Sequence, residues 1–291
     1  MVRAAYAESV RFAKGHGTGN DFVVLPDLDG AVNLTPAAVR ALCDRRHGIG
    51  ADGVLRVVAT AKVAEVAHLA DQADWFMDYH NADGTTAEMC GNGIRVYVRW
   101  LQRFGLAGAG EVPVATRDGV KTVLLPADEN GDITVDMGPP QIPGTSRAVR
   151  IADRSDPPVY PGLEVWMGNP HVVVALDDLA AAGSLVLAPL VEPQLETNVE
   201  FVVDRGDGRL AMRVHERGSG ETQSCGTGAC AAGVATALRR GQARGSWDVD
   251  VPGGRLRVEW TGETVLLTGP AVIVADGDLD PEWLARAGIV P

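Results

Sequence analysis

One arrangement of residues occurs twice in this chain and constrains its fold more than any other feature. A predicted strand leads through a polar loop into Cys-Gly-x-Gly and then into a helix, first at Cys90–Gly93 and again at Cys225–Gly228. The two cysteines are 135 residues apart in a chain of 291 residues, which is long enough for two domains with separate cores. The repeat therefore predicts two similar domains.

Hydrophobic periodicity predicts the same order of elements in both halves. In the first half we expect two strands around the turn GHGTGN, strands over 53–60 and 73–81, and a helix over 94–105. In the second half we expect two strands around GNP, a hairpin over 198–218, and a helix over 229–241. The boundary between the halves is expected in the polar loop 126–133, which contains Pro and Gly.

Composition excludes several classes of protein. The chain is 46% hydrophobic and 22% charged, the balance of a soluble globular protein, and its net charge of -12 argues against nucleic acid as a partner. No apolar run is long enough for a membrane span, and the first residues lack a signal-peptide pattern, so we expect a cytoplasmic protein with no membrane partner. Its four cysteines are expected to be thiols rather than a disulfide framework.

A cysteine directly before a helix has an unusual chemical environment. The unpaired N–H groups of the first helical turn and the positive end of the helix dipole both favour thiolate over thiol. The adjacent glycines let a ligand approach the backbone closely, so the same N–H groups could hold a carboxylate. One such site could equally be a structural turn with a buried thiol, but two in matching positions favour chemistry.

The remaining cysteines fit packing roles. Cys43 falls on the apolar face of a helix that follows Thr35, and Cys230 lies inside an Ala- and Gly-rich helix that has no polar face before Arg239. Zinc sites usually have Cys-x-x-Cys or Cys/His spacings, whereas four residues separate Cys225 from Cys230. The spacing therefore disfavours a metal centre.

A thiolate and a thiol on opposite faces of an α-amino acid could invert its α-carbon. The thiolate would remove the α-proton from one face, and the thiol would deliver a proton to the other. Helix N–H groups would stabilise the charge that develops on the substrate carboxylate. Such chemistry requires no metal or pyridoxal phosphate, and the chain's three lysines (Lys14, Lys62 and Lys121) lie in no evident cofactor motif.

Six segments carry a resemblance to a known family: GTGNDF, GIGAD, NADGTTAEMCGNG, GNPH, TNVEF and HERGSGETQSCGTGACA. They span residues 15–235, and in them the chain resembles the diaminopimelate epimerase family, the cofactor-independent two-cysteine epimerases of lysine and peptidoglycan precursor synthesis. The resemblance implies an α/β fold of two pseudo-symmetric domains, each a curved mixed β-sheet wrapped around a central α-helix. We expect these domains at 1–130, joined by 277–291, and at 131–276.

The resemblance also implies roles for individual residues. Cys90 and Cys225 would be the base and the acid, exchanging roles with the direction of reaction, and His171 and Glu216 would assist them, each at a different thiol. Glu216 would also contact a substrate ammonium, and Arg217 would pair with the distal carboxylate. The other implied substrate-binding residues are Asn20, Asn81, Gly91, Asn92, Asn169, Asn198, Gly226 and Thr227.

Other interpretations of these residues remain open from the sequence. Asn81 and Asn169 could be turn residues, and His171 could be a satisfied core histidine. Glu216 and Arg217 could be a solvated pair at a strand end.

Two positions inside the family segments are expected to contribute no side chain to binding. Asp21 is expected to order the first hairpin rather than contact substrate. Many family members carry Gln directly after GIGAD, where this chain has Gly53, so a side-chain contact there is impossible.

The implied function is conversion of LL-2,6-diaminoheptanedioate (LL-diaminopimelate) to the meso isomer, without cofactor or metal, by a homodimer. A proline or hydroxyproline racemase is the alternative within the same class, but those substrates lack the second charged end that Arg217 and the asparagines would bind. A non-catalytic amino-acid binding protein is the alternative outside that class. Such a protein would usually lose at least one of the two cysteines.

Overall fold

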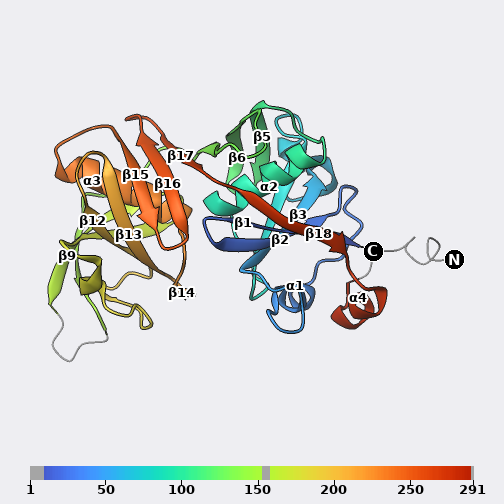
Figure 1. The fold of residues 1–291 in the computed structure, drawn as a ribbon, viewed down its shortest axis with the longest axis horizontal. Coiled ribbons are helices and arrows are strands. Elements are labelled where there is room, and N and C mark those ends of the chain that lie inside the picture. The colour runs from blue at the N-terminus through green and yellow to red at the C-terminus, as the bar shows by residue number, and fades with distance from the viewer. Residues whose placement is uncertain (1–9, 153–157, 290–291) are drawn as a thin grey trace. The chain divides into compact units, whose positions relative to one another are not determined.

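A computed structural model describes residues 10–152 and 158–289 of the chain. The chain divides into two compact units (Figure 1). Unit 1 comprises Met1–Gly17, Asp21–Ile133 and Pro270–Pro291, and unit 2 comprises Thr18–Asn20 and Thr134–Gly269. The first expected domain includes residues 1–9 and 290–291, which lie outside the described residues. The domain boundaries expected at 130 and 276 stay predictions.

Unit 1 is a mixed sheet in the order β18-β1-β2-β3-β4-β5-β6. β2 and β3 are parallel, as are β4 and β5, and the other neighbours whose direction is recorded are antiparallel. In Figure 1, red β18 from the end of the chain runs beside blue β1. The strand bounds are β1 Arg11–Gly17, β2 Asn20–Pro26, β3 Gly53–Ala59, β4 Trp75–Asn81, β5 Gly110–Thr116, β6 Gly119–Leu125 and β18 Val272–Asp278.

The sheet of unit 1 encloses one helix, α2 (Gly91–Arg103). This helix contacts β18 and β1 at one end of the strand order, β3 and β4 in the middle, and β6 at the other end. All residues from Gly91 to Leu101 are buried, because the sheet curves around the helix. Helices α1 (Pro36–Cys43) and α4 (Pro281–Ala287) contact each other, and Val39, Leu42 and Leu284 share a second core with residues of β2. Two short 3-10 helices, η1 (Thr60–Lys62) and η2 (Ala67–Leu69), follow β3.

A buried ion network stabilises β3 and β4. Asp78 on β4 is 4% exposed and pairs with Arg56 at 3.2 Å, Arg117 at 2.7 Å and His80 at 2.9 Å. Burial raises the pKa of Asp78, but hydrogen bonds and charge interactions with His80 and Arg117 outweigh it and bring the pKa down to about 2. The network therefore ties the stability of unit 1 to the ionised form of this carboxyl group.

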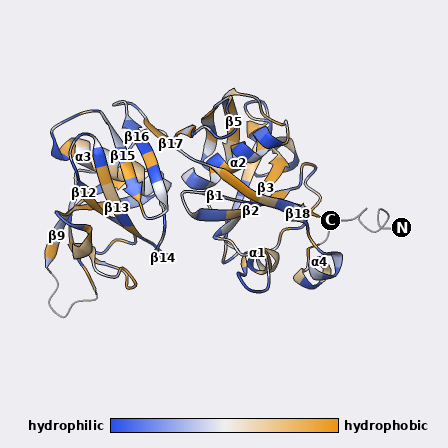
Figure 2. Ribbon diagram, in the orientation of Figure 1, coloured by the Kyte–Doolittle hydropathy of each residue, from blue (hydrophilic) through white to orange (hydrophobic). Residues whose placement is uncertain are grey.

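Unit 2 has the strand order β11-β8-β9-β10-β12-β13-β15-β16-β17-β7. Alternating burial along β15 and β16 appears in Figure 2 as alternating hydrophobic and hydrophilic residues. The bounds are β7 Ile133–Asp136, β8 Ser146–Arg150, β9 Val159–Trp166, β10 Pro170–Ala175, η3 Leu179–Ala182, β11 Leu190–Glu192, β12 Asn198–Asp204, β13 Arg209–Glu216, β14 Gly220–Glu221, β15 Gly245–Val251, β16 Gly254–Trp260 and β17 Val265–Gly269.

Helix α3 (Gly226–Arg239) is enclosed by this second sheet. It contacts β9, β10, β12, β13, β15, β16 and β17, and every residue from Gly228 to Ala237 is buried. The small side chains of its ACAAG segment let the strands approach closely, and Cys230 is fully buried among them. The prediction of an enclosed second helix with Cys230 as a packing residue is confirmed.

The two units share one chain path. In unit 1 the path β1, β2, β3, β4, α2, β5, β6 gives adjacent strands in the order β1-β2-β3-β4-β5-β6. In unit 2 the elements β9, β10, β12, β13, α3, β15, β16 repeat this order, with parallel pairs at the same two places. The predicted pseudo-symmetric α/β fold is therefore confirmed. In the part of the chain that the structure describes, no helix is both long and apolar enough to span a membrane.

Candidate active site

Each Cys-Gly-x-Gly segment forms the start of an enclosed helix, and its cysteine is the N-cap. Cys90 caps α2 with an extended backbone, and its Sγ accepts a hydrogen bond from Gly93 N at 3.4 Å. Cys225 caps α3 in the same way, with Gly228 N donating to its Sγ at 3.4 Å. Ser, Thr, Asn and Asp usually fill this position, so a thiol at both N-caps places two polarisable sulfurs in the positive field of a helix end.

Most of the predicted binding residues lie at or next to the ends of strands. In unit 1, Gly53 begins β3 and pairs with Asn81, which ends β4. In unit 2, Asn198 begins β12, and Glu216 ends the neighbouring strand β13. Asn20 begins β2, and Asn169 directly precedes β10.

The first turn of each enclosed helix packs against a strand of its own unit. A Cβ on Gly93 would lie 3.1 Å from Leu55 on β3, and a Cβ on Gly228 would lie 2.6 Å from Glu200 Oε1 on β12. Leu55 and Glu200 each lie two residues after the first residue of their strand, so they are equivalent in the two units. The equivalent positions differ in chemistry, since one carries an aliphatic side chain and the other a carboxylate.

Within unit 1, hydrogen bonds orient the side chains of Asn81 and Asn92. Asn81 Oδ1 accepts from the Tyr79 hydroxyl at 2.8 Å, and its Nδ2 donates to Thr85 at 3.1 Å. Asn92 is 1% exposed, and its Oδ1 accepts from Arg95 at 3.0 Å. This hydrogen bond ties the Asn92 side chain to the next turn of α2, and its predicted role of offering backbone groups to a ligand stays a prediction.

Unit 2 brings His171 close to Cys225. His171 and Glu200 are fully buried, and His171 Nδ1 lies 2.6 Å from Glu200 Oε1. The other ring nitrogen, Nε2, lies 2.9 Å from Asn169 Oδ1. Candidate ligand atoms of His171, Glu200 and Cys225 all lie within 4.8 Å of one another. The imidazole is thus hydrogen-bonded as a core histidine would be, but one of its neighbours is the N-cap thiol.

Glu216 also lies beside Cys225. Its Oε1 accepts a hydrogen bond from the Thr222 hydroxyl, and its charge is among the groups that act on the thiol. Burial raises the pKa of Glu216, while hydrogen bonds with Thr222 and Cys225 oppose this increase. That His171 and Glu216 assist two different thiols stays a prediction, although both contribute to the surroundings of Cys225 within unit 2.

The surroundings of Cys225 favour the neutral thiol. The residue is 5% exposed, and burial is the largest cause that raises its pKa well above the ordinary value. The negative charges of Glu216 and Glu200 raise the pKa further, whereas hydrogen bonds from Thr227 and Gly228 N lower it. Thr227 Oγ1 lies 3.5 Å from the sulfur. Burial and these two charges therefore disfavour the thiolate form of Cys225.

Two further predicted residues have defined backbone positions. Asn198 is 7% exposed, and its Oδ1 accepts a hydrogen bond from Arg217 N at 2.9 Å. The Arg217 side chain is exposed beyond the end of β13. Glu216 and Arg217 therefore do not form the solvated pair considered from the sequence, because one of them faces the buried thiol.

The chain turn at Thr18–Asn20 belongs to unit 2 by its contacts. There the Thr18 hydroxyl donates to Ser224 Oγ at 2.7 Å, directly before Cys225 in the sequence. Asp21, next in the chain, accepts hydrogen bonds from Lys14 at 2.6 Å and from Arg45 at 2.7 and 3.0 Å. These contacts support the expectation that Asp21 orders the hairpin.

Four residues near the candidate site were given no role from the sequence. Glu200 lies in the apolar run VEFVV, where alternation does not distinguish it from a surface residue. Thr222 and Ser224 lie in a polar loop that contains several hydroxyl groups. Tyr79 lies within a predicted strand, and only the position of its hydroxyl beside Asn81 connects it with the site.

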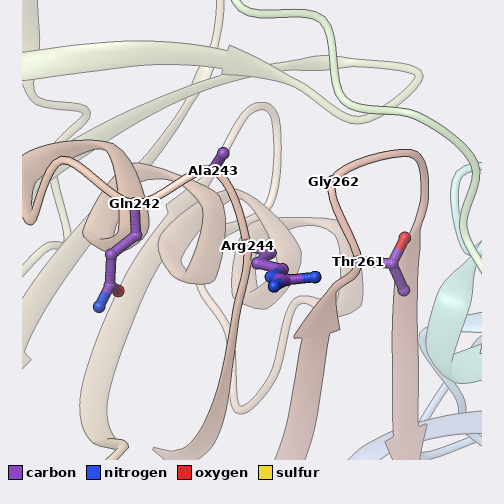
Figure 3. Close-up of a pocket in the computed structure, with 5 residues that line it drawn as sticks. All are labelled: Gln242, Ala243, Arg244, Thr261 and Gly262. Atoms are coloured by element: carbon purple, nitrogen blue, oxygen red, sulfur yellow. The ribbon is translucent and has the colours of Figure 1, made fainter.

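His171, Glu200 and Cys225 are also the described residues most suited to hold a metal ion. Both nitrogens of the imidazole already have hydrogen-bond partners, so metal binding would require the ring to release Glu200 or Asn169. Cys43 is buried, and burial raises its pKa to about 12, which agrees with its predicted packing role. A surface pocket of unit 2 (Figure 3) contains none of the predicted site residues; its lining is Gln242, Ala243, Arg244, Thr261 and Gly262.

The family model and the curated relatives agree on one family. The sequence profile described as diaminopimelate epimerase matches residues 12–143 and 164–274. A diaminopimelate epimerase of Streptomyces coelicolor is 52% identical, over 94% of this chain and 97% of the relative. Another from Thermobifida fusca is 50% identical, over 93% of this chain and 98% of the relative.

Solved structures with low sequence identity share the fold. A hydroxyproline epimerase from Agrobacterium vitis superimposes with a TM-score of 0.69 at 15% identity, covering 95% of each chain. A phenazine biosynthesis protein of the PhzF family from Bacillus anthracis gives 0.68 at 16% identity, covering 94% of this chain and 99% of the other. At these identities the likeness concerns the architecture of two similar units and not the substrate.

Proposed function

Because this chain belongs to the diaminopimelate epimerase family, we propose that it converts LL-diaminopimelate to meso-diaminopimelate by inverting one α-carbon. The observation that carries the proposal is the thiol N-cap that begins the enclosed helix in each of the two units. A helix N-terminus favours an anion, and a thiol placed there can exchange a proton at the same point.

The reaction needs one proton removed and one delivered. In the direction LL to meso, the Cys90 thiolate takes the α-proton and becomes a thiol. The electron pair left on the α-carbon delocalises into the carboxylate, and N–H groups at Gly91, Asn92, Gly226 and Thr227 stabilise the added charge. The Cys225 thiol then delivers its proton to the opposite face of the carbon and becomes a thiolate. The reverse reaction uses the same two groups with exchanged roles.

The difference between the two thiol environments supports this assignment of direction. Cys225 lies near Glu200 and Glu216, and its burial together with the charges of these two residues raises its pKa. The position equivalent to Glu200 in unit 1 is Leu55, which carries no charge. We propose that this asymmetry keeps Cys225 in the proton-donor form at the start of the reaction.

The remaining predicted residues suit the second amino-acid end of the substrate. Diaminopimelate carries an ammonium and a carboxylate at both ends, and amide side chains can donate to one and accept from the other. We propose that the four asparagines and Glu216 bind these groups, with Arg217 pairing with the distal carboxylate. Proline lacks a second charged end, so it would leave these polar side chains without partners.

We propose that the product, meso-diaminopimelate, serves as a precursor of lysine and of peptidoglycan. We propose that the protein acts in the cytoplasm, where a reducing environment keeps both catalytic thiols from oxidation. We further propose that it acts as a homodimer, and size-exclusion chromatography with light scattering tests this directly.

Solvent isotope incorporation tests the reaction itself. Reduced protein incubated with LL-diaminopimelate in heavy water should give meso product that carries one deuterium at the inverted α-carbon, detected by mass spectrometry. Parallel incubations with L-proline and trans-4-hydroxy-L-proline should give no exchange. Exchange on proline alone would identify the protein as a proline-type racemase, and no exchange on any of the three would refute the epimerase assignment.

Substitution of each cysteine tests the two-thiol mechanism. We expect Cys90→Ser and Cys225→Ser each to lower kcat by about 10²- to 10⁴-fold, because a hydroxyl is a much weaker acid than a thiol. Cys230→Ser is a matched control outside the proposed mechanism, and it should retain most activity where the folded fraction is unchanged by circular dichroism. Near-normal turnover in either N-cap variant would contradict the mechanism.

A further inference from the structure

Gly53 lacks a side chain because its space is occupied. A Cβ at this position would lie 2.6 Å from the His80 carbonyl oxygen and 2.7 Å from Tyr79 Cε2, both closer than ordinary contacts. The backbone of Gly53 is not in the left-handed region, so glycine is not required there for its conformation. The requirement is steric, and one of the two obstructing groups is an aromatic ring.

The Tyr79 ring is firmly placed beside Gly53. Tyr79 is 8% exposed and packs edge-on against Phe22, with ring centroids 6.0 Å apart and planes at 76°. Phe22 and Asn81 are the register partners of Gly53 on the two neighbouring strands. The ring therefore covers the position from which a side chain at residue 53 would project, and its hydroxyl reaches Asn81 at 2.8 Å.

A chain of hydrogen bonds fixes the direction of the Asn81 amide. The Asp83 carboxylate accepts from the Thr85 hydroxyl at 2.7 Å, and Thr85 Oγ1 must therefore accept from Asn81 Nδ2, at 3.1 Å. The opposite end of the amide, Oδ1, consequently faces Tyr79, whose hydroxyl must donate to it. A carboxylate at one end and a phenol at the other thus leave a single orientation for this side chain.

Unit 2 shows the alternative solution at the equivalent positions. There the strand that corresponds to β3 begins with Asn198, which does carry an amide side chain. The residue that corresponds to Tyr79, two positions before the end of the neighbouring strand, is Val214. In unit 2 the side chain of Asn198 thus has the small Val214 as its neighbour. In unit 1 Gly53 has no side chain, and its neighbour is Tyr79.

We propose that Tyr79 is a positioning residue that takes the place of the side chain missing at Gly53 and holds Asn81 with an N–H directed to a carboxylate of the substrate. The proposal rests on the proposed function, since it takes Asn81 as a substrate-binding residue. Tyr79 acts through Asn81 and not on the reacting carbon, so its effect belongs to substrate affinity.

Tyr79→Phe tests the role of the hydroxyl while keeping the ring. We expect KM for diaminopimelate to rise about 3- to 10-fold, the effect of one lost hydrogen bond, with kcat within about twofold of the original. Tyr160→Phe on β9 removes the hydroxyl of a partly buried tyrosine that packs against a core cluster of unit 2, and it should change neither constant. An unchanged KM in Tyr79→Phe, or a loss confined to kcat, would overturn the proposal.

A double-mutant cycle followed by thermal unfolding tests whether residues 53 and 79 compete for the same space. This test requires no measurement of enzyme activity. Gly53→Asn alone should lower Tm because of the close contacts with Tyr79 and His80. The combination Gly53→Asn with Tyr79→Val copies unit 2 and should recover at least half of that loss. Strictly additive changes in Tm would show that the two positions are independent and would refute the steric part.

A third measurement separates this proposal from the proposed function. Side-chain amide hydrogens of Asn81, followed by NMR, should exchange with solvent more slowly in the original protein than in Tyr79→Phe. If the protein does not epimerise diaminopimelate, the proposed function is refuted. The thermal-unfolding and amide-exchange measurements would still decide whether Tyr79 holds Asn81. Equal exchange in both proteins would refute the role of the hydroxyl whatever the substrate.

Discussion

Glu200→Gln should make the Cys225 thiol easier to ionise. Glu200 is fully buried, and a carboxylate oxygen lies within 4.8 Å of Cys225 Sγ. Its charge is one of the causes that raise the pKa of the thiol. The glutamine side chain has nearly the same shape, so the substitution removes the charge and retains most of the packing around α3.

The size of the effect follows from Coulomb's law. Two unit charges at 4.8 Å interact with about 3.5 kcal/mol at an effective dielectric constant of about 20, and with about 0.9 kcal/mol in bulk water. Removing the repulsion should therefore raise the ratio of thiolate to thiol at a given pH by about 5-fold to a few hundred-fold. The sign is fixed, because a negative neighbour can only oppose formation of a second negative charge.

Thiolate absorbance in the ultraviolet measures this ratio without a reagent that must reach a buried sulfur. The signal of Cys225 is the difference between each protein and its Cys225→Ala counterpart, followed as pH is raised. We expect the midpoint to move to lower pH in Glu200→Gln. Glu200→Asp retains the charge but shortens the side chain, so it separates the electrostatic effect from loss of the contact with His171.

A midpoint that is unchanged or higher in Glu200→Gln would refute the electrostatic argument. The same downward shift in Glu200→Asp would attribute the effect to the lost contact with His171. Activity provides a further check, because a Cys225 that ionises too early is no longer a proton donor. The alkaline limb of kcat/KM in the direction LL to meso should then move to lower pH in Glu200→Gln.

Two predictions concern stability. Gly228→Ala should destabilise the protein by roughly 1–3 kcal/mol in urea unfolding, because the added methyl would lie 2.6 Å from Glu200 Oε1 and 3.2 Å from Cys225 Sγ. Gly108→Ala is the control and should be nearly neutral, because its methyl would meet no atom within 4 Å. Equal losses of stability in the two variants would contradict the close-packing argument. The pKa of Asp78 is about 2 in the folded protein against 3.8 ordinarily, so its contribution of about 2 kcal/mol is complete above about pH 4 and is lost as pH falls toward 2. Asp78→Asn should flatten this part of the curve of unfolding free energy against pH, and an unchanged curve would exclude Asp78 as its source.

The repeat of strand, loop, cysteine and helix predicted the architecture because each of its parts can be recognised from neighbouring residues in the sequence. Glycine after cysteine, apolar spacing in the helices and alternation in the strands are all visible within short windows. The strands after residue 245 and the hairpin over 110–125 were not predicted, although their alternation is equally regular. Their order in the sheets depends on pairings between distant segments, such as β18 with β1, that no local pattern specifies.

The candidate site divides in the same way. The cysteines could be identified because their position before a helix is a local property, and so could the asparagines once the family segments were recognised. Glu200 could not, since a single carboxylate in VEFVV becomes informative only when β10 places His171 beside it. The Tyr79 ring beside Gly53 is likewise a contact between two strands, and neither residue alone indicates it.

In the proposed mechanism, differences between the two units would explain how one duplicated scaffold provides both an acid and a base. Identical caps at Cys90 and Cys225 would give two thiols of similar acidity, and neither would be reliably charged when the other is neutral. The strand beneath the helix differs, with Leu55 in unit 1 and Glu200 in unit 2, and Glu200 together with Glu216 places negative charge beside Cys225. The backbone repeat thus provides two helix ends, and in the proposed mechanism the residue beneath each helix would help to give the two thiols opposite roles. On this argument Leu55→Glu, which introduces a carboxylate beneath Cys90, should lower the rate of proton removal from LL-diaminopimelate.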